Sequence, residues 1–216
     1  MKVCEIFASI QGEGILIGTP MVFIRFSGCN LRCKWCDTKY AFEEGRKMTV
    51  PEVFGTALLA STCKWICLTG GEPLLQDVHE LKSLVEALHN VGKKITIETN
   101  GTIKPPDILI DLWSVSPKLS NSGMQDKVNI EALQLLSMRS VQFKFVVETI
   151  EDANEAFQLM DAHNIHGPVI FQPQGYGNIL QIWRKIALYV RANFAHRDVR
   201  VLPQLHILAY GHRKGI

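Results

Sequence analysis

The segment GCNLRCKWCDT, residues 28–38, decides how the rest of this 216-residue chain can be interpreted. It places Cys29, Cys33 and Cys36 directly after the apolar run at residues 21–26. Three thiols on one short loop can point at a common centre, because a loop does not alternate its side chains between two faces as a strand does. A structural zinc site would normally need a fourth ligand, and the sequence has no second Cys/His pair at a matching spacing. The three cysteines therefore indicate a 4Fe-4S cluster whose fourth iron is free to chelate a small molecule.

A second motif, TGGEP at residues 69–73, follows the next apolar run. The spacing C-x-x-x-C-x-x-C after a predicted strand, with Gly-Gly-Glu-Pro downstream, resembles the signature of the radical SAM superfamily. The resemblance implies that the three cysteines hold three irons of the cluster and that the fourth iron binds S-adenosylmethionine (SAM). One electron from the reduced cluster then cleaves SAM to methionine and a 5′-deoxyadenosyl radical, which abstracts a hydrogen atom from the substrate.

Apolar runs alternate with segments of helical periodicity along the chain, which is typical of an α/β protein with a parallel sheet. Six parallel strands are fewer than the eight of a closed (β/α)₈ barrel, so we expect a partial, open, TIM-like barrel of about six strands. Radical SAM folds resemble such a barrel. The predicted strands cover residues 21–26, 64–68, 95–99, 112–116, 141–147 and 168–171, with short further strands at 3–9 and 199–202. The predicted helices cover residues 51–60, 77–91, 130–138, 152–163 and 179–194.

The bulk properties of the chain exclude several classes of protein. The length fits one domain, residues 1–216. A net charge of +2 gives no electrostatic argument for nucleic acid. No apolar run approaches the ~20 residues of a membrane span, and the N-terminus lacks the apolar region of a secretory signal. We therefore expect a cytoplasmic protein that binds neither nucleic acid nor membrane, with Cys4, Cys63 and Cys67 as buried free thiols.

Most polar motifs follow a predicted strand, and the carboxyl ends of parallel strands meet at one edge of a sheet. We therefore expect these motifs to line one cavity. They are the loop that carries the three cysteines and the segments at residues 69–73, 98–101, 116–118 and 172–173. The glycines of the QGEG segment, residues 11–14, indicate backbone that approaches something closely, either a ligand or the rest of a plain hairpin turn. Arg25 lies inside an apolar run and needs an anionic partner or a position at the rim, and the residues alone favour the rim.

Beyond the superfamily signature, five features closely resemble the 7-carboxy-7-deazaguanine synthase family over essentially the whole chain. They are IQGEG at residues 10–14, Arg25, CDT at 36–38, ETNG at 98–101 and LPQLH at 202–206. The family converts 6-carboxy-5,6,7,8-tetrahydropterin to 7-carboxy-7-deazaguanine with loss of ammonia, on the route to queuosine and related 7-deazapurines. The resemblance implies a Mg²⁺-dependent lyase that is usually homodimeric and takes electrons from a donor such as flavodoxin or ferredoxin.

The same resemblance implies roles for individual residues. SAM would be bound by Trp35, Cys36, Asp37, Gly70, Gly71, Glu72, Ser116, Pro117, Lys118, Gln172, Pro173, Gln174 and Gly175. Mg²⁺, which prefers oxygen ligands, would be bound by Thr38 and by groups of the substrate. The pterin would be bound by Ile10, Gln11, Gly12, Glu13, Arg25, Thr69, Glu98, His206 and the carboxylate of Ile216. Arg25 suits the substrate carboxylate, because a guanidinium can bind it with two parallel hydrogen bonds.

Bland alternatives remain for several of these residues. Thr38 alone would be an ordinary loop hydroxyl, His206 a surface or core imidazole, and Glu98 a partner in a salt bridge that supports the fold. Among enzymes, the rival is a glycyl-radical activating enzyme, which has similar motifs but acts on a protein backbone and needs neither Thr38 nor the loop at residues 11–13. A rival of another class is a colourless zinc-binding module, with Cys4, Cys63 or Cys67 as the fourth ligand.

Overall fold

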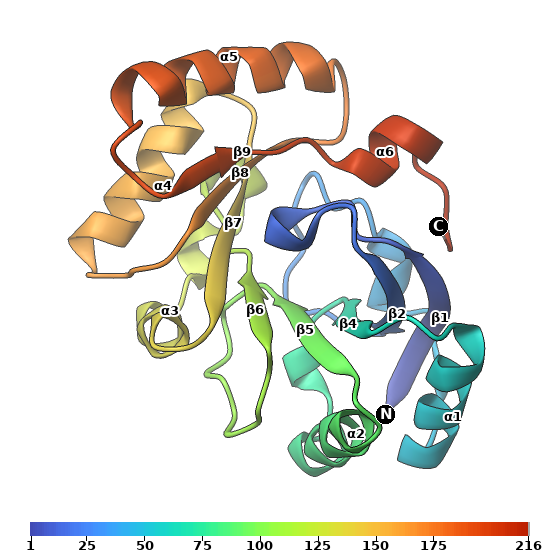
Figure 1. Ribbon diagram of the computed structural model, residues 1–216. Coiled ribbons are helices and arrows are strands. Elements are labelled where there is room, and N and C mark those ends of the chain that lie inside the picture. The colour runs from blue at the N-terminus through green and yellow to red at the C-terminus, as the bar shows by residue number, and fades with distance from the viewer. Residues whose placement is uncertain (216) are drawn as a thin grey trace.

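The computed structural model describes residues 1–215, and within them nine strands form a single sheet (Figure 1). The order of strands is β3-β1-β2-β4-β5-β6-β7-β8-β9. The strands are β1 Lys2–Ile10, β2 Pro20–Phe26, β3 Arg46–Lys47, β4 Trp65–Gly70, β5 Lys94–Thr99, β6 Leu112–Val115, β7 Val141–Val147, β8 Val169–Pro173 and β9 Val199–Val201. The α-helices are α1 Val50–Ala60, α2 Val78–Asn90, α3 Ile130–Ser137, α4 Ile150–Ala162, α5 Ile179–Asn193 and α6 Leu205–Tyr210.

The described sheet is an open barrel whose edges are β3 and β9. The strands from β2 through β4 to β9 run parallel, whereas β1 pairs antiparallel with both β2 and β3. This confirms the expected partial barrel. All six predicted strands are present, and the short strand expected near residue 200 adds a seventh parallel strand, β9.

The five predicted helices are present, with ends that shift by one or two residues. Helix α1 begins at a capping box in which Thr49 and Glu52 satisfy each other's backbone groups. Among the parallel strands β2 and β4 to β9, the alternation with helices is interrupted at one connection: residues 100–111 join β5 to β6 without a helix. Pro105 and Pro106 lie in this connection, and consecutive prolines remove the N–H donors and the backbone freedom that a helix needs. The sequence did not predict α6.

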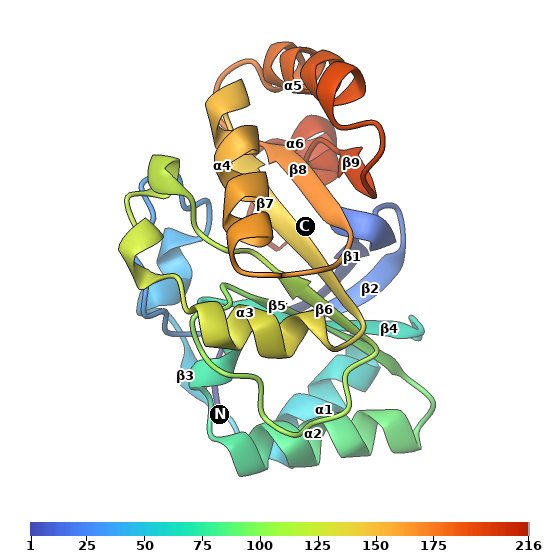
Figure 2. The ribbon, with the colours of Figure 1, turned by 90° about the vertical axis from the view of Figure 1, so that its left-hand side faces the viewer.

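Successive residues of each parallel strand face opposite sides of the sheet. In β7, Phe143, Phe145 and Val147 pack into the main hydrophobic core, beneath helices that lie along the outer face of the curved sheet (Figures 1 and 2). Lys144 points the other way, into the barrel. The same alternation places a polar residue from each of six strands on the inner face. Lys144 lies in the middle of β7, and the others lie near the carboxyl ends of their strands: Arg25, Thr69, Glu98, Ser114 and Gln172.

The connection between β1 and β2 reaches across the open barrel (Figure 1). It contains a single 3₁₀ turn, Gly14–Leu16. The backbone N–H of Ile15 donates a hydrogen bond of 2.7 Å to Oε1 of Gln142 on β7, and Nε2 of Gln142 donates to Ser114 on β6. This fastening carries residues 11–13 over the inner face of the sheet.

All six cysteines are free thiols. Cys67 is buried as expected, but Cys4 and Cys63 are only half-buried, so that expectation is wrong for them. Cys4 lies near one end of β1 and Cys63 in the turn before β4, where solvent reaches them. Among residues 1–215, no helix combines the length and the apolarity needed to cross a membrane.

Candidate active site

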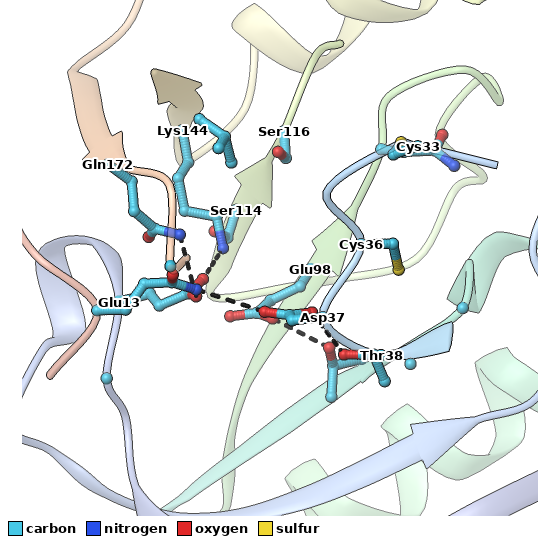
Figure 3. A pocket seen from close by; sticks show the side chains of 18 of the residues that line it. Glu13, Cys33, Cys36, Asp37, Thr38, Glu98, Ser114, Ser116, Lys144 and Gln172 are labelled. Carbon is cyan, nitrogen blue, oxygen red and sulfur yellow. Dashed lines mark hydrogen bonds and ion pairs between the residues drawn. The ribbon is translucent and has the colours of Figure 1, made fainter. Parts of the chain in front are cut away.

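One cavity lies at the carboxyl ends of β2 and β4 to β8, where the predicted motifs meet (Figure 3). The residues predicted to bind the cluster, SAM, Mg²⁺ and substrate line it, apart from Glu72, Pro117 and Pro173. Ile216 lies outside the described residues. The structure therefore brings the predicted residues together, while their individual roles stay predictions.

The cysteine loop, residues 27–38, enters the cavity without helix or strand. All three cysteines are half-buried. Burial raises the pKa of the Cys33 and Cys36 thiols, so iron must displace their protons when it binds. The backbone at the start of the loop is fixed from β4, because the N–H groups of Gly71 and Glu72 donate to the carbonyls of Phe26 and Gly28 at 3.0 and 2.8 Å.

The two glycines of the TGGEP motif are needed for this packing. A Cβ on Gly70 would lie 2.2 Å from the Phe26 carbonyl oxygen, and one on Gly71 would lie 1.9 Å from that of Gly28. Gly70 also has a φ of +132°, which residues with a side chain rarely adopt. In the structure, Gly70 thus allows a close approach to the end of β2 and Gly71 allows one to the cysteine loop, whatever they contribute to SAM binding.

Glu72 faces away from the cavity and is fully buried. Its carboxylate accepts hydrogen bonds from the backbone N–H groups of Leu74 (3.1 Å) and Asn100 (2.7 Å) and from the Thr99 hydroxyl (2.8 Å). Burial nevertheless raises the pKa of Glu72. The side chain therefore ties the loop after β4 to the loop after β5, and it does not reach the space where SAM was expected.

The donor set fits an iron–sulfur cluster better than zinc. Thiolates that share one zinc ion at ~2.3 Å would lie within about 4 Å of one another. In residues 1–215, the one group of three candidate ligands with atoms within 4.8 Å of one another is Glu13, Asp37 and His206, and it contains no cysteine. The three thiols instead surround an open cavity, and Cys67 packs in a separate apolar cluster with Met21 and Phe23.

Opposite the cysteine loop, Glu13 lies at the centre of a buried polar network (Figure 3). Its Oε1 accepts from Nε2 of Gln172 at 3.1 Å and from Nε2 of Gln204 at 2.7 Å, and its Oε2 pairs with the Lys144 ammonium. Burial opposes ionisation, but Lys144 and His206 lower the pKa of Glu13 to about 2. Glu13 also raises the pKa of Lys144 despite burial, so both groups are charged at neutral pH. Oε1 of Gln172 is buried and accepts no hydrogen bond from the described residues.

Glu98 is a second carboxylate on the cavity wall. Each of its oxygens accepts one hydrogen bond, from Nε2 of Gln11 at 3.1 Å and from the Thr69 hydroxyl at 3.0 Å. An ionised carboxylate has about four acceptor positions, so each oxygen keeps room for a further donor. Both observed partners are neutral, and none of the ion pairs among the described residues includes Glu98, so the salt-bridge alternative is not supported.

Arg25 is not exposed at the rim, and that reading of the sequence is wrong. Its side chain is 17% exposed, and Nε donates to Oε1 of Glu5 at 2.7 Å. The Tyr40 hydroxyl donates to the same oxygen, and the guanidinium lies over the rings of Phe7 and Tyr40. The anionic partner comes from β1, which pairs with β2 in a register that places Glu5 beside Arg25. The two terminal nitrogens make no hydrogen bond with the described residues.

Helix α6 reaches the cavity by packing on the loop after β1. A Cβ on Gly12 would lie 2.1 Å from Nδ1 of His206, and the N–H of Leu205 donates to the Gly12 carbonyl at 2.9 Å. A Cβ on Gly14 would meet Gln142 at 2.2 Å. The close approach predicted at residues 11–14 is therefore made to side chains of this protein. The packing of α6 on this loop places the side chains of Gln204 and His206 in the cavity.

Asp37 and Thr38 follow the last cysteine and face this polar network (Figure 3). The Thr38 hydroxyl donates to Oδ1 of Asp37 at 2.7 Å, and Gln204 donates to Oδ2 at 3.4 Å. With Glu13 and His206, Asp37 forms the group of candidate metal ligands described above. The carboxylates of Glu13 and Asp37 and the Thr38 hydroxyl are hard oxygen donors, which suit Mg²⁺, so these residues fit the cation that the sequence implied.

Sequence reasoning missed Ser114, Lys144 and Gln204, although all three line the cavity. Ser114 and Lys144 carried a signal, because each is a polar residue at an inward position of an otherwise apolar strand, as Arg25 is. Gln204 lies inside the LPQLH feature at residues 202–206, but it was given no role, since it precedes a helix that the sequence did not predict.

Comparison with known proteins identifies the class first. Residues 23–167 match the model of the Radical SAM superfamily, so this is a radical SAM protein, and its cofactors are a 4Fe-4S cluster and SAM. The 7-carboxy-7-deazaguanine synthase of Pyrobaculum aerophilum is 38% identical over 100% of this chain and 97% of its own length. That of Thermoplasma acidophilum is 34% identical over 100% of both. The crystal structure of QueE from Escherichia coli covers 95% of this chain and 94% of its own, with a TM-score of 0.76 at 26% identity.

The chain belongs to the 7-carboxy-7-deazaguanine synthase family. This confirms the family resemblance seen in the sequence. It also favours a lyase of small molecules over the glycyl-radical activating enzyme.

Proposed function

We propose that this protein converts 6-carboxy-5,6,7,8-tetrahydropterin to 7-carboxy-7-deazaguanine, with loss of ammonia, in the biosynthesis of queuosine and related 7-deazapurines. One observation carries the proposal beyond the similarity to named synthases. A single cavity has three thiols on one wall and, on the other, buried carboxylates and amides suited to a heterocycle rich in N–H groups.

The cysteine side of the cavity holds the cofactors. Cys29, Cys33 and Cys36 would bind the cluster, which supplies the electron that cleaves bound SAM and so generates the radical. Ser116 and Lys118 would meet the ribose and adenine of SAM from the loop after β6. Gln172, Gln174 and Gly175 would do so from β8 and its loop. Gln172 also belongs to the polar side through its hydrogen bond to Glu13, and its free Oε1 offers an acceptor.

The polar side binds the pterin. The guanine-like edge of a pterin presents neighbouring N–H donors, and Glu98 has one open acceptor position on each oxygen. Glu13 is held ionised by Lys144 and has less capacity left, because three donors already use it. The terminal nitrogens of Arg25 and the imidazole of His206 would meet the substrate carboxylate or a neighbouring polar edge.

Mg²⁺ would bind at Thr38, next to Asp37, and would bridge to the substrate. We expect Thr38→Ala to weaken the stimulation of turnover by Mg²⁺ several-fold, because an oxygen ligand is lost, while the cluster stays intact. Turnover against Mg²⁺ concentration, with iron content measured in parallel, tests this. Unchanged Mg²⁺ stimulation would remove Thr38 from the metal site.

The wider setting of the enzyme follows from its chemistry. A cluster that must be reduced for each radical event requires an electron donor, for which flavodoxin or ferredoxin is suitable. Free cysteines and an oxygen-sensitive cluster suit the reducing cytoplasm. We also propose that residues 1–216 act as one domain, because all strands join one sheet, and that the protein is a homodimer, as its family usually is.

The experiment that tests the function is an anaerobic assay of the reconstituted protein with SAM, reductant, Mg²⁺ and 6-carboxytetrahydropterin, read by mass spectrometry. We expect 7-carboxy-7-deazaguanine and 5′-deoxyadenosine to form together. Formation of 5′-deoxyadenosine without the deazaguanine would leave the radical SAM class intact and refute the substrate. A matched reaction with Cys33→Ala controls for chemistry that does not depend on the cluster.

A further inference from the structure

The 3₁₀ turn Ser120–Ser122, in the loop after β6, contacts the cysteine loop between its second and third cysteines. The Ser122 carbonyl accepts a hydrogen bond of 3.0 Å from the backbone N–H of Lys34. The Asn121 Oδ1 accepts one of 3.2 Å from Nε1 of Trp35, and its Nδ2 donates one of 3.0 Å to the carbonyl of Val146, near the end of β7. Asn121 thus links the residue just before Cys36 to a strand of the barrel.

The chemistry of the two partners makes an amide the suitable side chain at position 121. An indole N–H can only donate and a peptide carbonyl can only accept. The group between them must therefore accept on one side and donate on the other, which also fixes which atom of the Asn121 amide is oxygen. A carboxylate has no donor for Val146, and an aliphatic side chain has neither a donor nor an acceptor.

The indole is also held over its face. Nζ of Lys118 lies 5.2 Å from the Trp35 ring centroid, within the range of a cation–π contact, and donates to the Ser116 hydroxyl at 2.8 Å. Trp35 is therefore fixed at its edge by Asn121 and at its face by Lys118. Both contacts come from the same loop after β6.

The turn that carries Asn121 is itself anchored to the outer layer of the protein. The backbone N–H and the hydroxyl of Ser120 donate to the two carboxylate oxygens of Glu155 on α4, at 2.8 and 2.5 Å. The Ser122 hydroxyl closes the turn on the Leu119 carbonyl at 2.6 Å. Because the turn is hydrogen-bonded to the barrel on one side and to the cysteine loop on the other, it can hold that irregular loop in a fixed place relative to the barrel.

We propose that Asn121 is a positioning residue for the iron–sulfur cluster, which holds Trp35, and with it the segment from Cys33 to Cys36, in a fixed place relative to the barrel. Nearer the start of the loop, Asn100 does the same work by donating to Asn30 at 2.9 Å. The inference rests on the proposed assignment of the three cysteines to the cluster, and it is independent of the pterin substrate.

The test is the stability of the cluster in Asn121→Leu, which keeps the size of the side chain and removes both hydrogen bonds. Anaerobically reconstituted protein is exposed to EDTA, and the loss of cluster absorbance is timed. Of the two bonds, the one to Trp35 reaches the cysteine loop, and loss of one partly buried hydrogen bond of ordinary strength should accelerate cluster loss about fivefold and weaken SAM binding to a similar extent. Asn154→Leu is the matched control, because Asn154 also accepts a hydrogen bond from an aromatic residue, Tyr189, but lies on α4 away from the cavity.

A double variant separates positioning from a general loss of stability. Trp35→Phe removes the same indole N–H, so Trp35→Phe combined with Asn121→Leu should lose the cluster no faster than the faster of the two single variants. If the acceleration of cluster loss in the double variant equals the product of the accelerations in the two single variants, Asn121 does not act through Trp35, and the proposal is overturned. Wild-type rates in Asn121→Leu would also overturn it. If Asn121→Leu does not fold, Trp35→Phe alone decides. Cluster loss at the wild-type rate in Trp35→Phe would overturn the proposal, and faster cluster loss would support it.

These outcomes are distinguishable from failure of the cluster assignment itself. If Cys33→Ala retained the full cluster, the assignment of the cysteines would fall, whatever Asn121 does. If Cys33→Ala loses the cluster and Asn121→Leu behaves as the wild type, only the positioning role falls.

Discussion

The two walls of the cavity are built in opposite ways. The cysteine wall comes from twelve consecutive residues, 27–38, which have no regular structure and are held by hydrogen bonds from neighbouring loops. The polar wall comes from side chains on β5, β7 and β8, the loop after β1 and the start of α6. One of its hydrogen bonds, between Gln204 and Glu13, joins residues 191 positions apart. The first wall is local in sequence, and the second exists only once the chain has folded.

The two walls also differ in how much they contribute to the stability of the fold. The three cysteines are half-buried and lie outside the hydrophobic core, so we expect changes there to affect the proposed cluster chemistry more than the stability of the fold. Glu13 and Lys144 are opposite charges taken out of water, and each compensates the cost of burying the other. The polar wall therefore contributes to stability and to function together, and variants can separate the two walls.

The largest effect is expected from Cys33→Ala. Loss of one of the three proposed ligands should abolish the cluster and reduce SAM cleavage to background, while the free energy of unfolding of the apoprotein stays close to that of the wild type. Iron content, 5′-deoxyadenosine formation and urea unfolding measure these quantities. Retained SAM cleavage would contradict the assignment of the cysteine wall.

Next in size is Lys144→Met, which leaves the Glu13 carboxylate buried without its cation. We expect the variant to lose about 3–5 kcal/mol of unfolding free energy. Combining it with Glu13→Gln should recover most of that loss, because no uncompensated charge remains. Urea unfolding of the wild type, of Lys144→Met, of Glu13→Gln and of the double variant gives the four free energies of a double-mutant cycle. A double variant no more stable than Lys144→Met would show that the pair is not coupled.

A smaller effect is expected from Gly12→Ala. The added methyl group would lie 2.1 Å from the His206 ring and 2.9 Å from its backbone nitrogen, so α6 must move. Overpacking of this kind destabilises by about 1–3 kcal/mol. The KM for the pterin should rise, while cluster content and substrate-independent SAM cleavage do not change. A loss of cluster in this variant would show that the two walls are not separate.

The effect that is smallest near neutral pH is a dependence on acid. The pKa of Glu13 is lowered in the folded protein from an ordinary value near 4.5 to about 2. Its ionised form therefore stabilises the fold above about pH 4.5, and this contribution is lost as the pH falls towards 2. The advantage in stability of the wild type over the variant Glu13→Gln/Lys144→Met should shrink over that interval. An advantage that stays constant between about pH 5 and 3 would contradict the lowered pKa.

The contrast between the walls also explains what the sequence could predict. The strands and the helices α2 to α5 follow from hydrophobic periodicity, α1 from its capping box at Thr49 and the open barrel from the number of strands. The cysteine loop is recognisable because its spacing is local. Arg25 was misplaced because its partner, Glu5, is adjacent only through the antiparallel pairing of β1 with β2. Lys144 was overlooked because a lysine in a buried strand makes sense only when Glu13 faces it across the barrel. Helix α6 has six residues, too few for its periodicity to stand out.

The long separation between Gln204 and Glu13 has a consequence for how the molecule forms. Closing a loop of this size has an entropic cost that must be met before the contacts across it can stabilise anything, so such contacts form late in folding. A nascent chain that has emerged through β8 already holds the cysteine loop and the strands around it. It cannot yet complete the polar wall, because Gln204 and His206 follow β8 in the chain and leave the ribosome after it.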